Sequence, residues 1–251
     1  MTESAVTIRC PKCGGENPLS SGTRLMRCGF CDAALVVERG GAVAHYLLPR
    51  LLSQDEAAAA LRRWMAGNET VKDLDSKASL GTIAPLSFPM WFFRFDAGGQ
   101  EETLVEPAAP TPVPQLADLK VPAGRLLAYA PEAGVEETAA SVPLETARGW
   151  LVQRGTSAPT ETALVHLPLW RCEYAYAGRT WSALVDGSTG AVIAAVYPAK
   201  AETPYRAVAA IGLLLFVIEG FAIGNVLVKL AVYALTALPL LGVSYLVTRR
   251  V

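Results

Sequence analysis

From residue 207 to residue 247 the chain contains only two charged residues, Glu219 and Lys229. A turn-forming pair that starts at Gly224 divides this segment into two apolar stretches of similar length. Helices of about 20 residues, rising about 1.5 Å per residue, match the roughly 30 Å hydrocarbon core of a bilayer. We therefore predict a two-helix transmembrane hairpin over residues 206–249, with a buried hairpin in a soluble protein as the alternative. An ion pair between the two charges, serving a proton or ion path, is a further alternative.

Basic residues flank this hairpin on one side. Lys200 and Arg206 precede the first apolar stretch, and Arg249 and Arg250 follow the second. Because cytoplasmic loops carry an excess of Lys and Arg, both ends of the hairpin are predicted to be cytoplasmic. The N-terminal residues lack the basic start and apolar core of a signal peptide. We expect a two-pass protein of the inner (plasma) membrane, in contact with the lipid bilayer, and the alanine-rich composition favours a bacterial source.

Four of the five cysteines form two Cys-x-x-Cys pairs near the start of the chain: Cys10 with Cys13, and Cys28 with Cys31. A turn of this kind directs two sulfur atoms toward one point, and a glycine in or after it permits the tight backbone. Two such turns supply the four thiolates of a tetrahedral metal site. Two disulfides are the alternative, which the predicted cytosolic position disfavours because the cytosol is reducing.

Residues 6–39 resemble the zinc ribbon family, the rubredoxin-like four-cysteine domains, although the gap between the pairs is one residue shorter than the usual zinc spacing. The resemblance implies a domain of short strands and loops over residues 1–40, with structural Zn²⁺ held by the four cysteines. Rubredoxin-type iron is the alternative, and Phe30 is the only aromatic residue of this segment that could pack around it. Zinc ribbons bind nucleic acids, bind proteins or serve structure alone, so the resemblance leaves the function open.

The charge of this segment argues against nucleic-acid binding. Its basic residues are nearly balanced by acidic ones. They are Arg9, Lys12, Arg24, Arg27 and Arg39 against Glu3, Glu16, Asp32 and Glu38. Zinc held by four thiolates adds negative charge, whereas phosphate binding depends on clustered Lys and Arg. The whole chain, with a net charge of -1, has no excess of positive charge either.

The middle of the chain contains an internal repeat. The segment FPMWFFRFDAGGQEETLVE, which begins at Phe88, aligns without gaps with LPLWRCEYAYAGRTWSALV, which begins at Leu167. This alignment pairs Trp91 with Trp170. Each segment is typical of a strand, a glycine turn and a second strand, with a two-residue hairpin turn at Ala177-Gly178 in the second copy.

A helix is predicted before each hairpin. SQDEAAAALRRWMAG has Ser53 as its N-cap and completes a capping box with Glu56, and SVPLETARGWLVQRG has Ser141 as its N-cap. The region 41–205 is therefore predicted as two copies, about 41–107 and 117–200, each a helix with an antiparallel sheet, which makes the chain an α+β multidomain membrane protein. The proline-rich EPAAPTPVPQL between the copies is expected to be a stiff, exposed linker.

No catalytic motif is evident. His45 and His166, the only histidines, each lie in an apolar, strand-like run, and Cys172 aligns with Phe93 of the first copy, which predicts a buried position. Glycine-rich phosphate loops and the nucleophile elbow are missing from the sequence. We therefore expect no enzyme activity, no small-molecule substrate and no cofactor other than zinc.

Together these features predict a membrane-anchored, cytosol-facing adaptor or assembly subunit that binds a protein partner. One alternative is a membrane-tethered nucleic-acid-binding or regulatory protein that uses the ribbon. A second is an accessory subunit of an enzyme or transporter complex, with the chemistry in a partner chain.

Overall fold

A computed structural model describes residues 6–39, 41–121, 126–156, 158–200 and 203–250. Along the chain its elements are β1 (Thr7–Arg9), β2 (Glu16–Pro18), β3 (Leu25–Arg27), β4 (Ala34–Glu38), β5 (Gly41–Leu47), α1 (Gln54–Met65), α2 (Leu74–Lys77), β6 (Ser79–Ala97), β7 (Gln100–Pro107), the 3-10 helix η1 (Pro114–Asp118), β8 (Leu127–Ala128), β9 (Glu136–Glu137), α3 (Leu144–Gln153), β10 (Glu161–Tyr176), β11 (Arg179–Asp186), β12 (Val192–Ile193), α4 (Thr203–Ala222) and α5 (Val226–Arg250). The chain forms two compact units, the first from residues 1–63 and 78–197 and the second from residues 64–77 and 198–251. The domain boundaries expected near residues 40 and 205 stay predictions.

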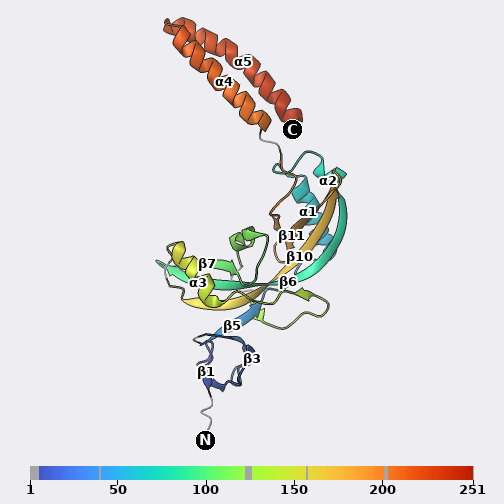
Figure 1. The fold of residues 1–251 in the computed structure, drawn as a ribbon, viewed down its shortest axis with the longest axis vertical. Helices are drawn as coiled ribbons and strands as arrows, with labels where there is room; N and C mark the ends of the chain where they lie inside the picture. Colours follow the sequence, from blue (N-terminus) through green and yellow to red (C-terminus); the bar gives the residue numbers. More distant parts are fainter. Residues whose placement is uncertain (1–5, 40, 122–125, 157, 201–202, 251) are drawn as a thin grey trace. The chain divides into compact units, whose positions relative to one another are not determined.

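Two long antiparallel strands, β6 and β10, form the centre of the first unit (Figure 1). They pair along most of their length, with Phe88 directly opposite Leu167 and one register shift between Cys172 and Tyr174. Residues 163–170 of β10 are all buried. A continuous buried run of this kind is expected of a strand that is covered on both faces.

Each long strand carries two further strands on its outer edge. β7 follows β6 through Gly98 and Gly99, and β11 follows β10 through Ala177 and Gly178. All four turn residues have positive φ, between 51° and 90°, as two-residue hairpins of type I′ require. The hairpin predicted at Ala177-Gly178 is confirmed. Farther along, a short parallel partner takes the same edge, β5 beside β10 and β9 beside β6.

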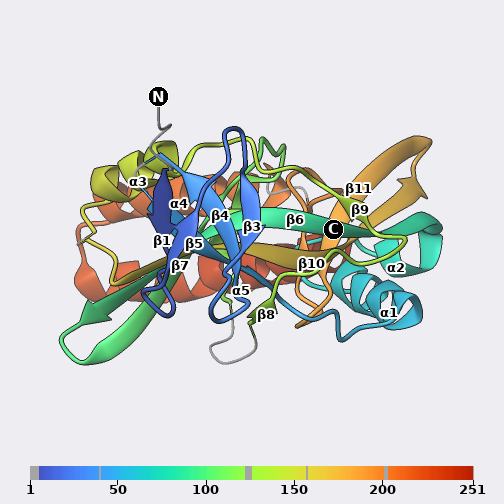
Figure 2. The same cartoon turned by 90° about the horizontal axis from the view of Figure 1, so that it is seen from below.

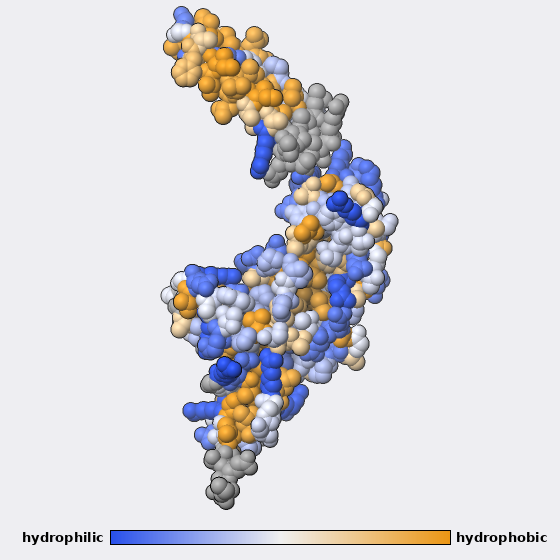
Figure 3. All heavy atoms as spheres, viewed as in Figure 1, coloured by the Kyte–Doolittle hydropathy of each residue, from blue (hydrophilic) through white to orange (hydrophobic). Residues whose placement is uncertain are grey.

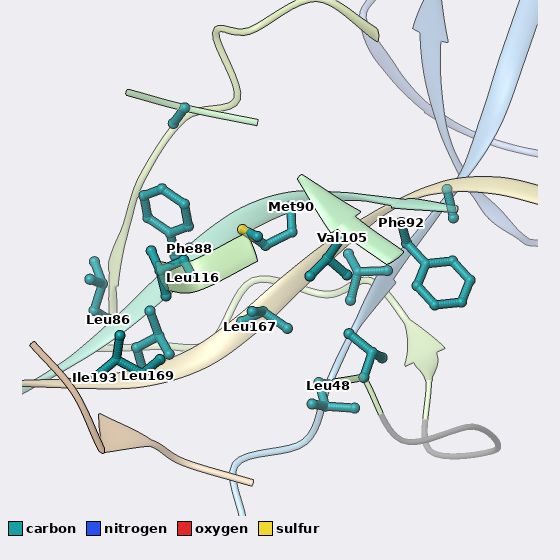
Figure 4. Close-up of a cluster of buried hydrophobic side chains, with 14 of the residues drawn as sticks. Leu48, Leu86, Phe88, Met90, Phe92, Val105, Leu116, Leu167, Leu169 and Ile193 are labelled. Atoms are coloured by element: carbon teal, nitrogen blue, oxygen red, sulfur yellow. The ribbon is translucent and has the colours of Figure 1, made fainter. Parts of the chain in front are cut away.

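The first unit has two main clusters of buried apolar side chains on this sheet. In one, Phe88, Met90 and Leu167 pack together with Leu116 of η1 (Figure 4). In the other, Trp91 packs with residues of α3. Because both clusters draw on β6, alternate residues of this strand are buried in different clusters, as the two-residue period of a strand requires.

The expectation of an exposed proline-rich linker is only partly right, since Pro110, Pro112 and Pro114 are exposed but other residues of the segment are buried. Ala108, Ala109 and Leu116 are all buried, and the last two belong to the core cluster of Figure 4. The N–H of Ala108 donates to the carbonyl of Pro89 at 3.0 Å, which continues the pairing of β7 with β6 beyond Pro107. The apolar residues between the prolines bury enough surface to hold this segment on the sheet.

The helix caps agree with the sequence at α1 and differ at α3. The N–H of Ser53 donates to Glu56 Oε2 at 2.8 Å, and the N–H of Glu56 donates to Ser53 Oγ at 3.3 Å. This is the predicted capping box. At α3 the predicted N-cap Ser141 is wrong, because the helix begins after Pro143, which has no side-chain cap.

The segment that contains the four clustered cysteines is continuous with the large sheet. β1 and β2 form a separate two-stranded sheet, whereas β3 pairs with β4 and β4 pairs with β5 (Figure 2). Because β5 also pairs with β10, hydrogen-bonded strands connect the cysteine segment to the centre of the first unit.

In the second unit, α4 and α5 pack against each other. The rings of Phe216 and Tyr233 meet edge to face with centroids 5.4 Å apart, and the Tyr233 hydroxyl donates to the Phe216 carbonyl at 3.2 Å. Asn225 caps α5, since its Oδ1 accepts the N–H groups of Leu227 at 3.0 Å and Val228 at 3.3 Å.

Within the described residues, one helical segment is long and apolar enough to cross a membrane, Val226–Tyr245 of α5, and none of it is buried. The apolar part of α4 runs only from Ala207 to Ala222, which is fewer than the roughly 20 residues that a span needs. The structure therefore supports a single candidate span and does not support the expected two-pass topology. Apolar residues make up most of the coloured surface of these helices (Figure 3).

Candidate metal centre

The four cysteines expected to be metal ligands lie together. The sulfur atoms of Cys10, Cys13, Cys28 and Cys31 all lie within 4.8 Å of one another. The sulfurs of Cys10 and Cys31 are 3.8 Å apart, and those of Cys13 and Cys28 are 3.6 Å apart. A disulfide would place two sulfur atoms about 2.05 Å apart. All four residues are therefore free thiols, and the structure lacks the disulfides considered above.

The spacing of the sulfur atoms fits one tetrahedral ion. With metal–sulfur distances near 2.3 Å, a tetrahedron has edges of about 3.8 Å. The two measured sulfur–sulfur distances, 3.8 and 3.6 Å, agree with such an edge. Four thiolates in this geometry suit zinc or iron. The donor set therefore fits a metal ion without selecting which one.

The same turn is built at both cysteine pairs. The N–H of Gly14 donates to the carbonyl of Cys10, and the N–H of Asp32 donates to the carbonyl of Cys28, both at 2.9 Å. The backbone is left-handed at each of these donors, with φ of 76° at Gly14 and 55° at Asp32. Glycine adopts this conformation at no steric cost, whereas a residue with a side chain pays about 1–2 kcal/mol.

Asn17 joins the two turns, and sequence reasoning did not single it out. Its side chain is buried, its Oδ1 accepts the N–H of Gly29 at 2.8 Å, and its Nδ2 donates to the carbonyl of Gly15 at 3.0 Å. Nδ2 also lies 3.6 Å from Cys28 Sγ. Outer partners of this kind orient metal ligands. The sequence around Asn17 is typical of a loop, whereas the structure places it in β2, and only its burial between the two turns reveals this role.

Backbone N–H groups favour the thiolate at Cys28. Those of Cys31 and Phe30 lower the pKa of Cys28 to about 6. At Cys13 the N–H of Gly15 acts in the same direction, but the neighbouring sulfurs, that of Cys31 foremost, and desolvation together outweigh it and raise the pKa to about 12. Several thiolates this close repel one another, so a bound cation is needed to keep all four charged, and its binding releases protons.

The surface around the centre is not strongly basic. Arg24 lies 3.5 Å from Glu38, and Arg27 lies 3.1 Å from Asp32. Two of the basic side chains that could contact phosphate are therefore already paired with carboxylates. Phe30, which is 71% exposed, lies over Gly15, where an added Cβ would come within 2.5 Å of the phenyl ring.

The structure also brings both histidines together, which the sequence did not predict. The rings of His45 on β5 and His166 on β10 have centroids 5.0 Å apart, and Tyr129 stacks on His45 at 3.8 Å. Nδ1 of His166 lies 3.0 Å from Ser87 Oγ and 3.8 Å from Glu137 Oε1. Both groups approach the same ring nitrogen, whereas a catalytic triad needs one partner at each nitrogen.

Burial keeps this cluster and the remaining cysteine uncharged. It lowers the pKa of His45 to about 3, with the nearby His166 as a second cause. Burial also lowers the pKa of His166, partly offset by Glu137. Cys172 is buried as expected, and burial raises its pKa to about 11, which disfavours the reactive thiolate.

No known family model, curated protein or solved structure matches this chain. The likeness of residues 6–39 to a zinc ribbon therefore depends on the cysteine spacing and on the geometry of the four sulfur atoms.

Proposed function

We propose that this chain is a membrane-anchored adaptor or assembly subunit that binds a protein partner on the cytosolic side of the membrane. The observation that carries this proposal is the exposed apolar surface of α4 and α5. Phe221 is 91% exposed, Leu227 78% and Leu213 67%. Apolar surface of this extent needs a cover, and lipid suits the length of the apolar segment of α5.

We propose Zn²⁺ as the ion of the four-cysteine centre. A site closed by four thiolates has no open position for a substrate, which favours a structural role. Electron-transfer iron would be expected to sit among packed aromatic side chains, whereas Phe30, the aromatic residue of this segment, is largely exposed to solvent. The centre then stabilises a small domain whose surface is available for protein contacts.

The membrane proposal extends to topology: we propose that the chain crosses the membrane twice, with both ends cytoplasmic. The basic residues Lys200, Arg206, Arg249 and Arg250 lie at the two outer ends of the α4–α5 segment in the sequence. Cysteine labelling of intact cells tests this topology. A cysteine at Asn225 should react with an impermeant reagent and one at Val251 should not, and the reverse pattern would invert the topology.

Protein binding is favoured over the alternative functions. The pairing of Arg24 and Arg27 with carboxylates disfavours a nucleic-acid surface. The neutral histidine cluster lacks the arrangement of a catalytic triad, which supports a non-enzymatic role. The partner-binding face is addressed in the next subsection.

The test uses the full chain extracted from membranes with detergent. Elemental analysis should find about one zinc per chain, and partner capture should fall in a Cys13→Ser, Cys28→Ser variant. Cys172→Ala, which removes a cysteine outside the centre, should keep both the zinc and the partner. Stoichiometric iron would overturn the zinc assignment, and release of the protein by an alkaline carbonate wash would overturn the membrane anchor.

A further inference from the structure

Residues 126–138, which we call the strap, lie against the sheet beside the histidine cluster. The strap pairs with β5 through the two residues of β8 and with β6 through the two residues of β9. None of its side chains is buried, whereas His45 and His166, which it contacts, are each only 3% exposed. The strap therefore covers buried polar groups, and its contact with the apolar core is that of the partly buried Leu126.

Two ion pairs and a contact with neutral His166 hold the strap in place. Each of its three carboxylates meets a basic or titratable side chain of the first unit. The pairs are Glu132 with Arg50 at 3.4 Å, Glu136 with Arg171 at 3.1 and 2.8 Å, and Glu137 with His166 at 3.8 Å. Within the strap, the hydroxyl of Tyr129 donates to Glu137 at 2.6 Å. The attachment is thus polar and largely ionic.

One of the basic groups that receive the strap, Arg50, does not depend on it for its position. Arg50 donates to the carbonyl of Leu169 at 2.8 Å and to that of Leu86 at 3.2 Å. Its guanidinium also lies 4.9 Å from the centre of the Trp170 ring. With a side chain only 13% exposed, Arg50 remains a preformed anion contact if Glu132 moves away.

The strap is attached by fewer interactions than the strands beneath it. Segments with little buried apolar surface and short hydrogen-bond ladders open at low free-energy cost. The pocket between the strap and His166 has a volume of only about 10 Å³, room for about one water molecule, so the closed strap leaves no space for a larger ligand. When the strap moves away, the edges of β5 and β6 each lose a paired strand.

We propose that the strap occupies, within its own chain, the docking site of an acidic, extended segment of the partner protein, which displaces it. This inference builds on the proposed adaptor function and names the chemistry of the partner. The arriving segment pairs with the freed strand edges by β-augmentation. Its carboxylates replace those of Glu132, Glu136 and Glu137 on Arg50, Arg171 and His166.

Peptide binding to the full chain in detergent tests the proposal. The probe is a labelled peptide with the strap sequence YAPEAGVEET (residues 129–138), and the control peptide carries Gln in place of each Glu. Wild-type protein should bind the probe weakly. A Glu132→Gln, Glu136→Gln, Glu137→Gln variant should bind it about tenfold more tightly, since its own strap then competes without its ion pairs to Arg50 and Arg171 and without the carboxylate contact to His166. Added Arg171→Gln should remove this gain.

Equal binding of both peptides by the triple variant would overturn the proposal. Hydrogen exchange of the wild type gives a readout that does not depend on that variant. The strap amides of Tyr129 and Thr138, which donate to His45 and Ser87, should exchange faster than those of β6 and β10, and faster still at high salt. If the strap amides exchanged only through global unfolding, the docking proposal would also be overturned. Neither result bears on zinc content or membrane extraction, so failure of the docking proposal is separable from failure of the adaptor proposal.

Discussion

Phe88 and Leu167 lie directly opposite each other on β6 and β10, and each is the first residue of one of the two similar sequence segments. The strands are antiparallel, so a residue a given number of positions after Phe88 and the residue the same number of positions after Leu167 lie equally far from this pair, in opposite directions. These are the residues that the sequence alignment matches. The register therefore places the segments about a local twofold axis between Phe88 and Leu167. One step earlier, the matching residues Ser87 and His166 meet at 3.0 Å across this axis.

The matching tryptophans follow the same relation. The indole N–H of Trp91 donates to the carbonyl of Val142 at 2.9 Å, and that of Trp170 donates to the carbonyl of Leu52 at 3.2 Å. Val142 lies two residues before α3, and Leu52 lies two residues before α1. Each tryptophan thus holds the segment that leads into the helix of the other half. Duplication as the origin of this arrangement stays a prediction.

Removal of either tryptophan should destabilise the first unit to a similar extent. Trp91→Ala and Trp170→Ala should each lower the free energy of unfolding by about 3–5 kcal/mol, because both side chains are buried. Trp→Phe at either site should cost about 1 kcal/mol or more through the lost indole hydrogen bond. Urea unfolding followed by circular dichroism measures these changes. Val152→Ala, at a side chain 74% exposed, is the control, and a negligible effect at only one tryptophan would contradict the equivalence.

The two cysteine turns should respond oppositely to changes at Gly14 and Asp32. Gly14→Ala should lower the stability of the metal-bound segment by about 1 kcal/mol, because φ is 76° there. Asp32→Gly should raise it by a few tenths to 1 kcal/mol, since the exposed pair with Arg27 contributes little. Competition with a zinc chelator measures the difference. Weaker metal retention in Asp32→Gly than in the wild type would contradict this reading.

The histidine cluster should make the first unit sensitive to acid. Burial lowers the pKa of His45 from 6.5 to about 3, so the unfolded chain binds a proton that the folded chain does not. Stability from this group is complete above about pH 6.5 and is lost as the pH falls toward 3, with a slope of at most about 1.4 kcal/mol per pH unit. His166 has a lowered pKa and adds in the same direction.

Unfolding in urea at several pH values between 7 and 4 measures this slope. The slope reports the number of protons that the chain takes up on unfolding. The His45→Gln variant should show a shallower dependence than the wild type. A slope that His45→Gln leaves unchanged would assign the acid sensitivity to other groups.

A side-chain hydrogen bond should hold α4 to α5. Glu219 Oε1 lies 2.5 Å from the hydroxyl of Thr236, and the carbonyl of Val232, 3.0 Å away, is a second acceptor within reach of the same proton. Thr236→Val should weaken helix pairing by about 0.6–1.7 kcal/mol, whereas Glu219→Gln should be tolerated because an amide can replace the bond. Cross-linking between cysteines on the two helices reports the change. If Lys229→Met had the larger effect, the ion pair with Glu219 would be the true link.

Several features could be predicted from short stretches of sequence because nearby residues determine them. Two Cys-x-x-Cys turns direct their sulfur atoms through local backbone geometry, so the four ligands were predictable from spacing alone. The Ala177-Gly178 turn and the Ser53 capping box are local for the same reason. The apolar composition of α5 likewise predicts a candidate span from length and hydropathy.

Only the tertiary structure decided which distant segments meet. The pairing of β6 with β10 and of β5 with β10 buries side chains that local propensity does not assign to partners. Those pairings bring His45, His166 and Ser87 into one cluster, hold the proline-rich segment against the core, and let the strap reach Arg50 and Arg171. Thr236, rather than Lys229, meets Glu219 because the rotation of one helix against another is set by packing over their whole contact. Spacing along the chain determines the local structures that nearby residues form. Burial of apolar surface determines which residues from distant parts of the sequence come into contact.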